Sequence, residues 1–392
     1  MSESFNFAAT PHIHFGVGKR HELEKVIASF GRRVLLVTGA ASFEASGYGQ
    51  LLLDNLQAQF ELRRVRVSGE PSPQLVDQAV AGYAGWLPDC VVAIGGGSVI
   101  DAAKAIAGLL PSGASVMEYL EGVGRGSIYN GPSTPFIALP TTAGTGGETS
   151  KNAVLSVVGK NGFKKSFRHD LLVARVIILD PELSLGCPPD VTAACGMDAL
   201  TQLLESYLSS DASPITDALA LSGLAHVRES LIPAVEQGDN LEARSGMLYA
   251  SSISGLTLAN AGLGSVHGLA SPLGAFFPIP HGVVCGTLVS AAARQNISLL
   301  EAMNPLHPAL YKYANAGRLM LDDQQLSDKA ARTGLLDLLD EWTERLAIAR
   351  LSAFGISAAD IPHITAHASG GMKTNPVQLT DIQAQALLVS RL

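Results

Sequence analysis

The sequence has few charged residues, and those it has are mostly acidic. Charged residues make up 16% of the 392 residues and apolar ones 47%, so the composition excludes a disordered chain. The 27 basic residues are outnumbered by 35 acidic ones, and the resulting net charge of −8 argues against a nucleic-acid-binding protein. No run of 18 apolar residues is free of charges and helix breakers, so we expect no transmembrane helix and no membrane partner.

Cysteine is also scarce. The cysteines show no C-x-x-C spacing, so we expect them to be reduced and mostly buried. The chain starts Met-Ser-Glu-Ser-Phe-Asn-Phe, which lacks the basic region and the apolar core of a secretory signal. Both features favour a cytoplasmic protein. The four cysteines are Cys90, Cys187, Cys195 and Cys285.

Short apolar runs bounded by glycine or proline alternate with helical stretches up to about residue 180. This pattern predicts a mostly parallel sheet covered by helices on both faces. After Pro188-Pro189 the periodicity is helical almost throughout, so we predict an α/β domain over 1–184 and an all-α domain over 185–392. The predicted strands are 33–38, 61–67, 90–94, 135–139 and 175–179. The predicted helices of the second domain are 191–210, 214–232, 241–275, 283–299 and 327–346.

A glycine loop connects the strand at 90–94 to a helix that we expect over 102–109. Glycines let the backbone approach a phosphate closely, and a helix start presents free N–H groups to it. Ser98 and Asp101 have the spacing of a helix capping box. Since Ile100 replaces the last glycine of G-x-G-x-x-G, a tight turn without a ligand is the alternative. The candidate phosphate-binding residues are Gly95, Gly96, Gly97, Ser98 and Asp101.

A second glycine-rich loop follows the strand at 135–139 and carries Thr141, Thr142 and Thr145. Small hydroxyl residues at the carboxyl end of a strand suit a nucleotide site at the edge of an open sheet. The alternative is an ordinary loop.

The end of the first strand bears on the choice of cofactor. In dinucleotide-binding folds an acidic residue there can bind the ribose hydroxyls and repel a 2′-phosphate. Here the strand ends at Gly39, and Glu44 already lies on the next helix. We therefore predict that NADP is tolerated or preferred over NAD, unless another residue decides.

Four further residues are candidate metal ligands. Asp198 and Gln202 are four apart in a helical run, which puts them on one face. His267 lies in the helical run 265–276, and His281 follows Pro280 on a loop or at a helix start. A carboxylate and two imidazoles suit a catalytic Fe²⁺ or Zn²⁺ with an open position. A solvated aspartate and two packed histidines are the alternative, because spacing alone does not bring these positions together.

The chain carries, in this order, the motifs Gly95–Ser98 with Asp101, Pro140–Gly146, Asp180–Leu183, Gly196–Leu200, and His267 with His281-Gly282. Together these motifs resemble the iron-containing (group III) alcohol dehydrogenase family, over nearly the whole chain. The resemblance implies a dinucleotide-binding α/β domain and an all-helical domain, with the cofactor and a divalent metal meeting between them. It implies hydride transfer between NAD(P) and a small alcohol, aldehyde or ketone held by the metal, in a homodimer or larger homo-oligomer.

The chain departs from the family at two positions. Asp198, His267 and His281 match three of the four ligands Asp, His, His and His, but the fourth position holds Gln202. An amide oxygen is a weaker donor than imidazole, so the affinity of the site for its metal should fall. The resemblance implies iron as the metal, and zinc is the alternative. The family's proton-transfer histidine is replaced by Ser271, which cannot buffer near neutral pH but can pass a proton to water or to a ribose hydroxyl.

The resemblance leaves three other functions open. One is a zinc polyol (glycerol-type) dehydrogenase with three protein ligands. Another is a lyase similar to dehydroquinate synthase, which needs a basic cluster that the apolar stretch 267–281 does not offer. The third is a nucleotide-binding relative without metal. Within that stretch, Phe276 and Phe277 either shape the substrate pocket or belong to the core.

Overall fold

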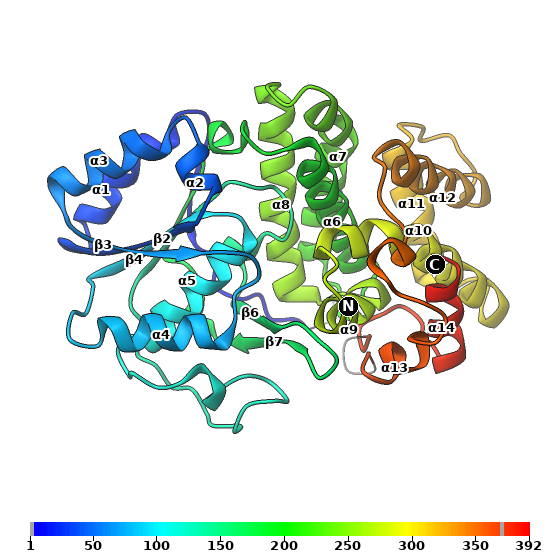
Figure 1. The fold of residues 1–392 in the computed structure, drawn as a ribbon. Helices are drawn as coiled ribbons and strands as arrows, with labels where there is room; N and C mark the ends of the chain where they lie inside the picture. Colours follow the sequence, from blue (N-terminus) through cyan, green and yellow to red (C-terminus); the bar gives the residue numbers. More distant parts are fainter. Residues whose placement is uncertain (1–3, 369–371) are drawn as a thin grey trace.

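The computed structural model describes residues 4–368 and 372–392. An α/β half built around one sheet lies beside a half made of helices (Figure 1). This arrangement confirms the predicted fold class.

The main sheet has six strands in the order β1-β8-β5-β4-β2-β3, and every neighbouring pair is parallel. All five predicted strands are present, with ends that differ by one residue at most. The edge strand β1 was not predicted, because it is four residues long and mostly exposed and therefore shows no apolar run. The strands are β1 (His12–Phe15), β2 (Arg33–Gly39), β3 (Glu61–Val67), β4 (Cys90–Gly95), β5 (Phe136–Pro140) and β8 (Val176–Leu179).

Helices cover both faces of this sheet (Figure 1). The helices α1 (Leu23–Ala28), α2 (Ser42–Ala45) and α3 (Gly49–Gln59) lie on one face, and α4 (Pro73–Tyr83) and α5 (Gly97–Leu109) on the other. The middle strand β4 is therefore buried along its whole length, as its continuous apolar sequence requires.

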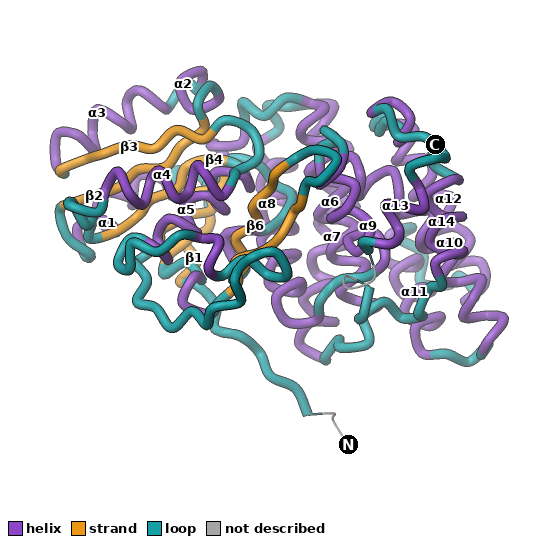
Figure 2. The backbone as a smooth tube through the Cα atoms, turned by 60° about the horizontal axis from the view of Figure 1, so that its bottom comes forward, coloured by secondary structure: helices purple, strands orange, loops and turns teal. Residues whose placement is uncertain are grey.

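An antiparallel hairpin, β6 (Asn152–Val157) and β7 (Phe163–Arg168), projects from the α/β half toward the helices (Figure 2). Its β7 strand packs against α9. The sequence did not predict this hairpin, because its second strand, Phe-Lys-Lys-Ser-Phe-Arg, is polar and half-exposed.

The second half contains only helices among its described residues. The prediction of a single helix over 241–275 is wrong. The helix α8 ends at Ala261, the next residue, Gly262, has a φ of 72°, and α9 starts at Ser265. The helices are α6 (Pro189–Leu208), α7 (Pro214–Glu236), α8 (Leu241–Ala261), α9 (Ser265–Phe276), α10 (His281–Met303), α11 (Pro308–Met320), α12 (Asp328–Arg345), α13 (Ile361–Ala366) and α14 (Asp381–Val389). Short 3₁₀ helices lie at Lys19–Glu22, Val116–Glu118, Gly147–Thr149, Asp170–Leu172, Pro181–Ser184 and Leu351–Phe354.

One helix, α10, is long and apolar enough to cross a membrane. Most of it is buried inside the protein: 67% of its most apolar 18-residue window lies within the fold. It is therefore a core helix of the second half.

Candidate active site

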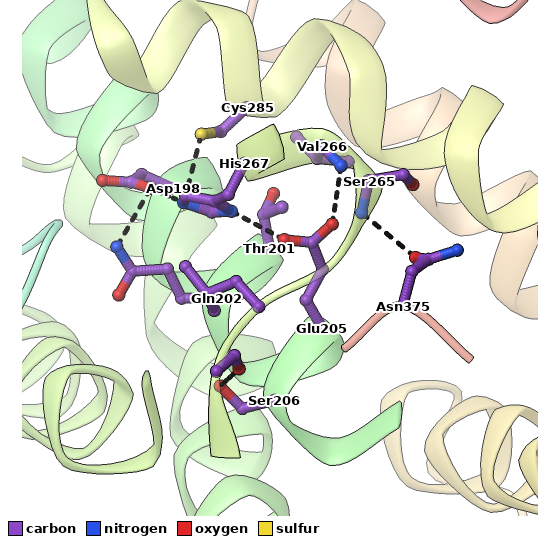
Figure 3. Close-up of polar contacts among 12 residues, drawn as sticks. Asp198, Thr201, Gln202, Glu205, Ser206, Ser265, Val266, His267, Cys285 and Asn375 are labelled. Carbon is purple, nitrogen blue, oxygen red and sulfur yellow. Dashed lines mark hydrogen bonds and ion pairs between the residues drawn. The ribbon is translucent and has the colours of Figure 1, made fainter. Parts of the chain in front are cut away.

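Four potential metal ligands from three helices converge at one point. Asp198 comes from α6, His267 from α9, and both His281 and Cys285 from α10; one donor atom of each lies within 4.8 Å of the others. The Nε2 atoms of His267 and His281 lie 3.2 and 3.6 Å from Asp198 Oδ1. The Cys285 sulfur lies 3.6 Å from His267 Nε2 and 3.8 Å from His281 Nε2. Figure 3 shows Asp198, His267 and Cys285 facing one another.

Sequence reasoning named three of these residues and assigned Cys285 no place in the site. The available signal was its position four residues after His281, which places both side chains on one face of α10. A cysteine alone is a weak signal, since most free cysteines simply pack in the core.

Two glycines allow α10 to approach α6 closely. A Cβ on Gly282 would overlap the carbonyl group of Ala194, and one on Gly286 would lie 3.0 Å from the Met197 Cβ. Because His281 and Cys285 alternate with these glycines, the close crossing places both ligands beside Asp198.

A buried carboxylate orients His267. Glu205, two turns after Asp198 on α6, has Oε2 2.7 Å from His267 Nδ1, and its other oxygen accepts a 2.7 Å hydrogen bond from the Val266 backbone N–H (Figure 3). This bond fixes the ring so that Nε2 faces the ligand cluster. Sequence reasoning missed Glu205, although its spacing of seven from Asp198 puts both on one helix face.

The electrostatics of the cluster follow from burial and mutual contact. Burial alone would raise the pKa of Asp198, but His281 and the hydrogen bond from His267 outweigh it, so the pKa lies below its usual value. Burial lowers the pKa of His281 to about 4 and raises that of the Cys285 thiol to about 12. Burial alone would lower the pKa of His267, but Cys285, Asp198 and Glu205 outweigh it and raise that pKa well above its usual value. The cluster therefore combines an ionised carboxylate with one protonated and one neutral imidazole.

This donor set fits a divalent cation. A carboxylate oxygen, two imidazole nitrogens and a sulfur lie within 4.8 Å of one another. These are donor types that divalent transition metals bind, and a bound ion would take the place of the proton between His267 and Asp198.

The two remaining residues predicted near the metal lie close to the cluster but make other bonds. Gln202 is buried; its Nε2 donates to Asp198 Oδ1 at 3.4 Å, and its Oε1 accepts a 3.0 Å bond from the Ser254 hydroxyl. The Ser271 hydroxyl donates to the Lys164 carbonyl at 3.0 Å and so ties α9 to β7.

The structure brings the two predicted glycine loops together. A Cβ on Gly96 would lie 3.1 Å from the Thr142 hydroxyl, and one on Gly97 would lie 3.1 Å from the Thr145 hydroxyl. The Thr141 N–H also donates to the Gly95 carbonyl at 3.1 Å. The start of α5 is therefore framed by both loops at the carboxyl edge of the sheet.

The predicted capping box is wrong. The helix α5 begins at Gly97 rather than near 102, and its N-cap is Gly96, which offers no side chain. Ser98 consequently lies within the first turn, where the N–H groups have no intrahelical partner and can face a phosphate. Asp101 is one turn further along, and burial raises its pKa to about 7.

Two arginines that sequence reasoning overlooked lie near Gly39, at the end of β2. Arg64 and Arg66 of the neighbouring strand β3 contact Glu44 at 2.7 and 3.2 Å. Arg64 also donates to the Thr38 hydroxyl at 2.9 Å. Glu44 is thus occupied by ion pairs with basic neighbours.

A cleft of about 840 Å³ lies between the start of α5 and the loop before α10. It runs from Ser98 in the first turn of α5 to Pro280, the residue before His281, and Phe277 also lines it. Lys164 lines it too and pairs with Glu70 at 3.0 Å. Phe276 instead packs into the helical core, with its ring 4.5 Å from that of His363.

Comparison with known proteins agrees with this geometry. The chain matches the family "Iron-containing alcohol dehydrogenase" over residues 10–181 and "Fe-containing alcohol dehydrogenase family, C-terminal" over residues 192–392. It is 32% identical to alcohol dehydrogenase 4 of Saccharomyces cerevisiae, over 99% of this chain and 98% of the yeast protein. It is 36% identical to long-chain-alcohol dehydrogenase 1 of Geobacillus thermodenitrificans, over 69% of this chain and 68% of that protein.

Solved structures have the same fold. A 1,3-propanediol oxidoreductase superposes with a TM-score of 0.89 at 29% identity, covering 100% of both chains. The sulfoacetaldehyde reductase of Bifidobacterium kashiwanohense, solved with NAD⁺, superposes with a TM-score of 0.85 at 28% identity, covering 99% of each chain. The chain belongs to the iron-containing alcohol dehydrogenase family and is a metal-dependent, NAD-linked oxidoreductase that acts on alcohols.

Proposed function

We propose that Asp198, His267 and His281 hold the catalytic divalent metal of this alcohol dehydrogenase and that the two glycine loops hold its nicotinamide cofactor. The observation that carries the proposal is the convergence of three donors beside a cleft that extends to the first turn of α5. Small alcohols and the corresponding aldehydes are the substrate class. The cofactor-binding residues are Gly39, Gly95, Gly96, Gly97, Ser98, Asp101, Thr141, Thr142 and Thr145.

The chain's own residues position the reactants. The metal supplies Lewis-acid chemistry at the substrate oxygen. Glu205 keeps His267 in one ring orientation, and Asp198 contributes the fixed negative charge. The first turn of α5 binds the cofactor phosphates through backbone N–H groups, and the cleft holds the nicotinamide near the substrate while excluding water.

Ser271 replaces the proton-transfer histidine of the family in this proposal. Its hydroxyl lies one turn after His267 and is hydrogen-bonded to Lys164, a residue that lines the cleft. A hydroxyl in that position passes a proton to water or to a ribose hydroxyl without storing it, so turnover should show no histidine-like titration from this position.

In this proposal NADP is either tolerated beside NAD or preferred to it. Gly39 offers no carboxylate to repel a 2′-phosphate, and the basic side chains of Arg64 and Arg66 lie beside the same strand end. Glu44 contacts both arginines and weakens their field, so NAD remains a usable cofactor.

The remaining features of the proposal concern the whole protein. We place the division between the cofactor-binding and metal-binding domains at 184/185, near the passage from the last sheet strand to α6. We also propose a homodimer or larger homo-oligomer in the cytoplasm. Of the described residues that line the cleft, Lys164 is the only basic one, which favours an alcohol over the phosphate and carboxylate substrate of a dehydroquinate synthase-like lyase.

The experiment is to replace the ligands singly. His267→Ala and His281→Ala should each abolish alcohol-dependent cofactor reduction while nucleotide binding, measured by calorimetry, stays nearly unchanged. The control is His21→Ala, which removes an exposed histidine of the α/β half. Full activity in either ligand variant would remove that residue from the metal site.

A further inference from the structure

We propose that the thiolate of Cys285 is the fourth protein ligand of the metal and takes the place that histidine has in the family and that Gln202 occupies here. The inference rests on the proposed function, because it presumes that Asp198, His267 and His281 bind the metal. It moves the fourth ligand from α6 to α10 and changes the metal that the site prefers.

The donor distances support a shared ion. With bonds of about 2.3 Å to sulfur and about 2.0–2.1 Å to nitrogen or oxygen, four protein ligands arranged tetrahedrally around zinc have edges of about 3.6 Å between S and N and about 3.3 Å between O and N; the substrate oxygen would then bind as a fifth ligand. The Cys285 sulfur lies 3.6 and 3.8 Å from the two imidazole nitrogens. The Asp198 oxygen lies 3.2 and 3.6 Å from the same nitrogens. All four measured edges agree with the expected ones within about 0.3 Å.

Gln202 is already engaged by other partners. Only its carbonyl oxygen can coordinate a cation, and that oxygen accepts the Ser254 hydroxyl at 3.0 Å. Its amide group instead donates toward Asp198 at 3.4 Å. Gln202 is therefore a positioning residue for the carboxylate ligand, and the vacancy left by the missing imidazole is filled by the sulfur from the opposite helix.

The thiolate alters the charge and the softness of the site. On metal binding the Cys285 S–H bond breaks, its proton passes to water, and the sulfur lone pair forms the bond to the metal; no oxidation occurs. Together, Asp198 and a Cys285 thiolate neutralise a divalent ion, whereas a carboxylate with three imidazoles leaves one positive charge. A soft sulfur ligand favours zinc or cobalt over Fe²⁺. We expect the isolated protein to retain zinc in the presence of equal iron.

Cobalt provides a direct readout of the sulfur ligand. The full-length protein, stripped with a chelator and reloaded with Co²⁺, should show the strong near-ultraviolet absorption of a thiolate-to-cobalt charge transfer. Cys285→Ala should lose this band and bind zinc more weakly, by at least the roughly 10–100-fold that loss of a ligand's hydrogen bond costs. Cys90→Ala is the matched control, because Cys90 is equally buried but lies in the sheet.

A measurement without substitution guards against misfolding of the variant. X-ray absorption at the zinc edge of the unmodified protein should show one sulfur at about 2.3 Å among nitrogen and oxygen ligands. Stoichiometric metal without the charge-transfer band or the sulfur shell would overturn the role of Cys285 and leave the proposed function intact. Absence of stoichiometric metal binding would overturn both.

Discussion

At the scale of single residues, the site depends on contacts made by side chains that do not themselves face the cluster. Glu205 fixes the ring of His267, so Glu205→Gln should lower metal affinity roughly 10–100-fold. The amide can still accept the Val266 N–H, so the fold should survive. Chelator competition measures the effect, with Glu301→Gln, an exposed glutamate of α10, as the control. Unchanged affinity would mean that His267 needs no carboxylate to hold it.

A second residue-scale prediction concerns cofactor choice. Arg66 forms an ion pair with Glu44, but its side chain is 62% exposed. Because of this exposure, its guanidinium group is accessible to a 2′-phosphate. Arg66→Ala should raise the KM for NADP about tenfold, equivalent to ~1.4 kcal/mol, and should leave that for NAD nearly unchanged. Arg345→Ala removes another exposed arginine paired with a glutamate and serves as the control. Equal weakening of both cofactors would place Arg66 away from the 2′-position.

The sequence predicted individual residues of the site better than it predicted the residues that contact them. Asp198, His267 and His281 stand in recognisable motifs, but Cys285 and Glu205 are identified only by helical spacing from those residues. Arg64 and Arg66 were missed because their strand looks like a polar edge, and only the pairing of β2 with β3 brings them beside Gly39. Side chains that meet across elements carry no sequence signal that periodicity can reveal.

At the scale of elements, the crossing of α6 and α10 brings the carboxylate and the α10 ligands together. Gly282→Ala introduces a methyl group against the Ala194 backbone, which cannot move aside as a flexible side chain can. The helices should separate, with metal affinity falling at least about tenfold and stability falling by about 1–3 kcal/mol. Metal stoichiometry and the melting temperature check both effects.

The control for this crossing is Gly186→Ala, since a Cβ at Gly186 meets nothing within 4 Å. Full metal binding by Gly282→Ala would show that the crossing distance does not set the site.

Strands and helices with a clear apolar pattern were predicted well. Elements whose position depends on tertiary contacts were not. The strands of the sheet core are continuous apolar runs because helices cover both their faces. The hairpin β6–β7 shows no such run, since one of its strands is half-exposed. The break between α8 and α9 was missed because apolar periodicity continues across it, although the glycine at 262 marks the helix end.

At the scale of the whole molecule, the second glycine loop joins the two halves. Its Thr149 hydroxyl donates to the Ser252 carbonyl of α8 at 3.1 Å, and a Cβ on Gly146 or on Gly255 would overlap the opposite backbone. The same loop is tied to α5 by Lys104, whose buried ammonium donates to the Gly147 carbonyl at 2.6 Å. These contacts join the second glycine loop, α5 and the helical half at one packed junction.

This junction also contains a buried acid whose ionisation should affect global stability. Glu148 is 2% exposed, its Oε1 has no hydrogen-bond partner among the described residues, and burial raises its pKa to about 7 from 4.5. When the pKa of an acid is higher in the folded than in the unfolded state, the protonated form stabilises the fold. This stabilisation is fully present below the pKa of the unfolded state and is lost as the pH rises to the pKa of the folded state. The shift corresponds to about 3 kcal/mol, lost between about pH 4.5 and pH 7.

Glu148→Gln should remove this contribution, because a neutral amide never has to ionise inside the junction. The variant should match the natural protein in free energy of unfolding at pH 5 and exceed it by about 2–3 kcal/mol at pH 8. Urea unfolding at both pH values measures the difference, with the exposed Glu229→Gln as the control. An identical pH dependence in Glu148→Gln and the natural protein would mean that Glu148 has the same pKa in the folded and unfolded states, so that Lys104 offsets the effect of burial.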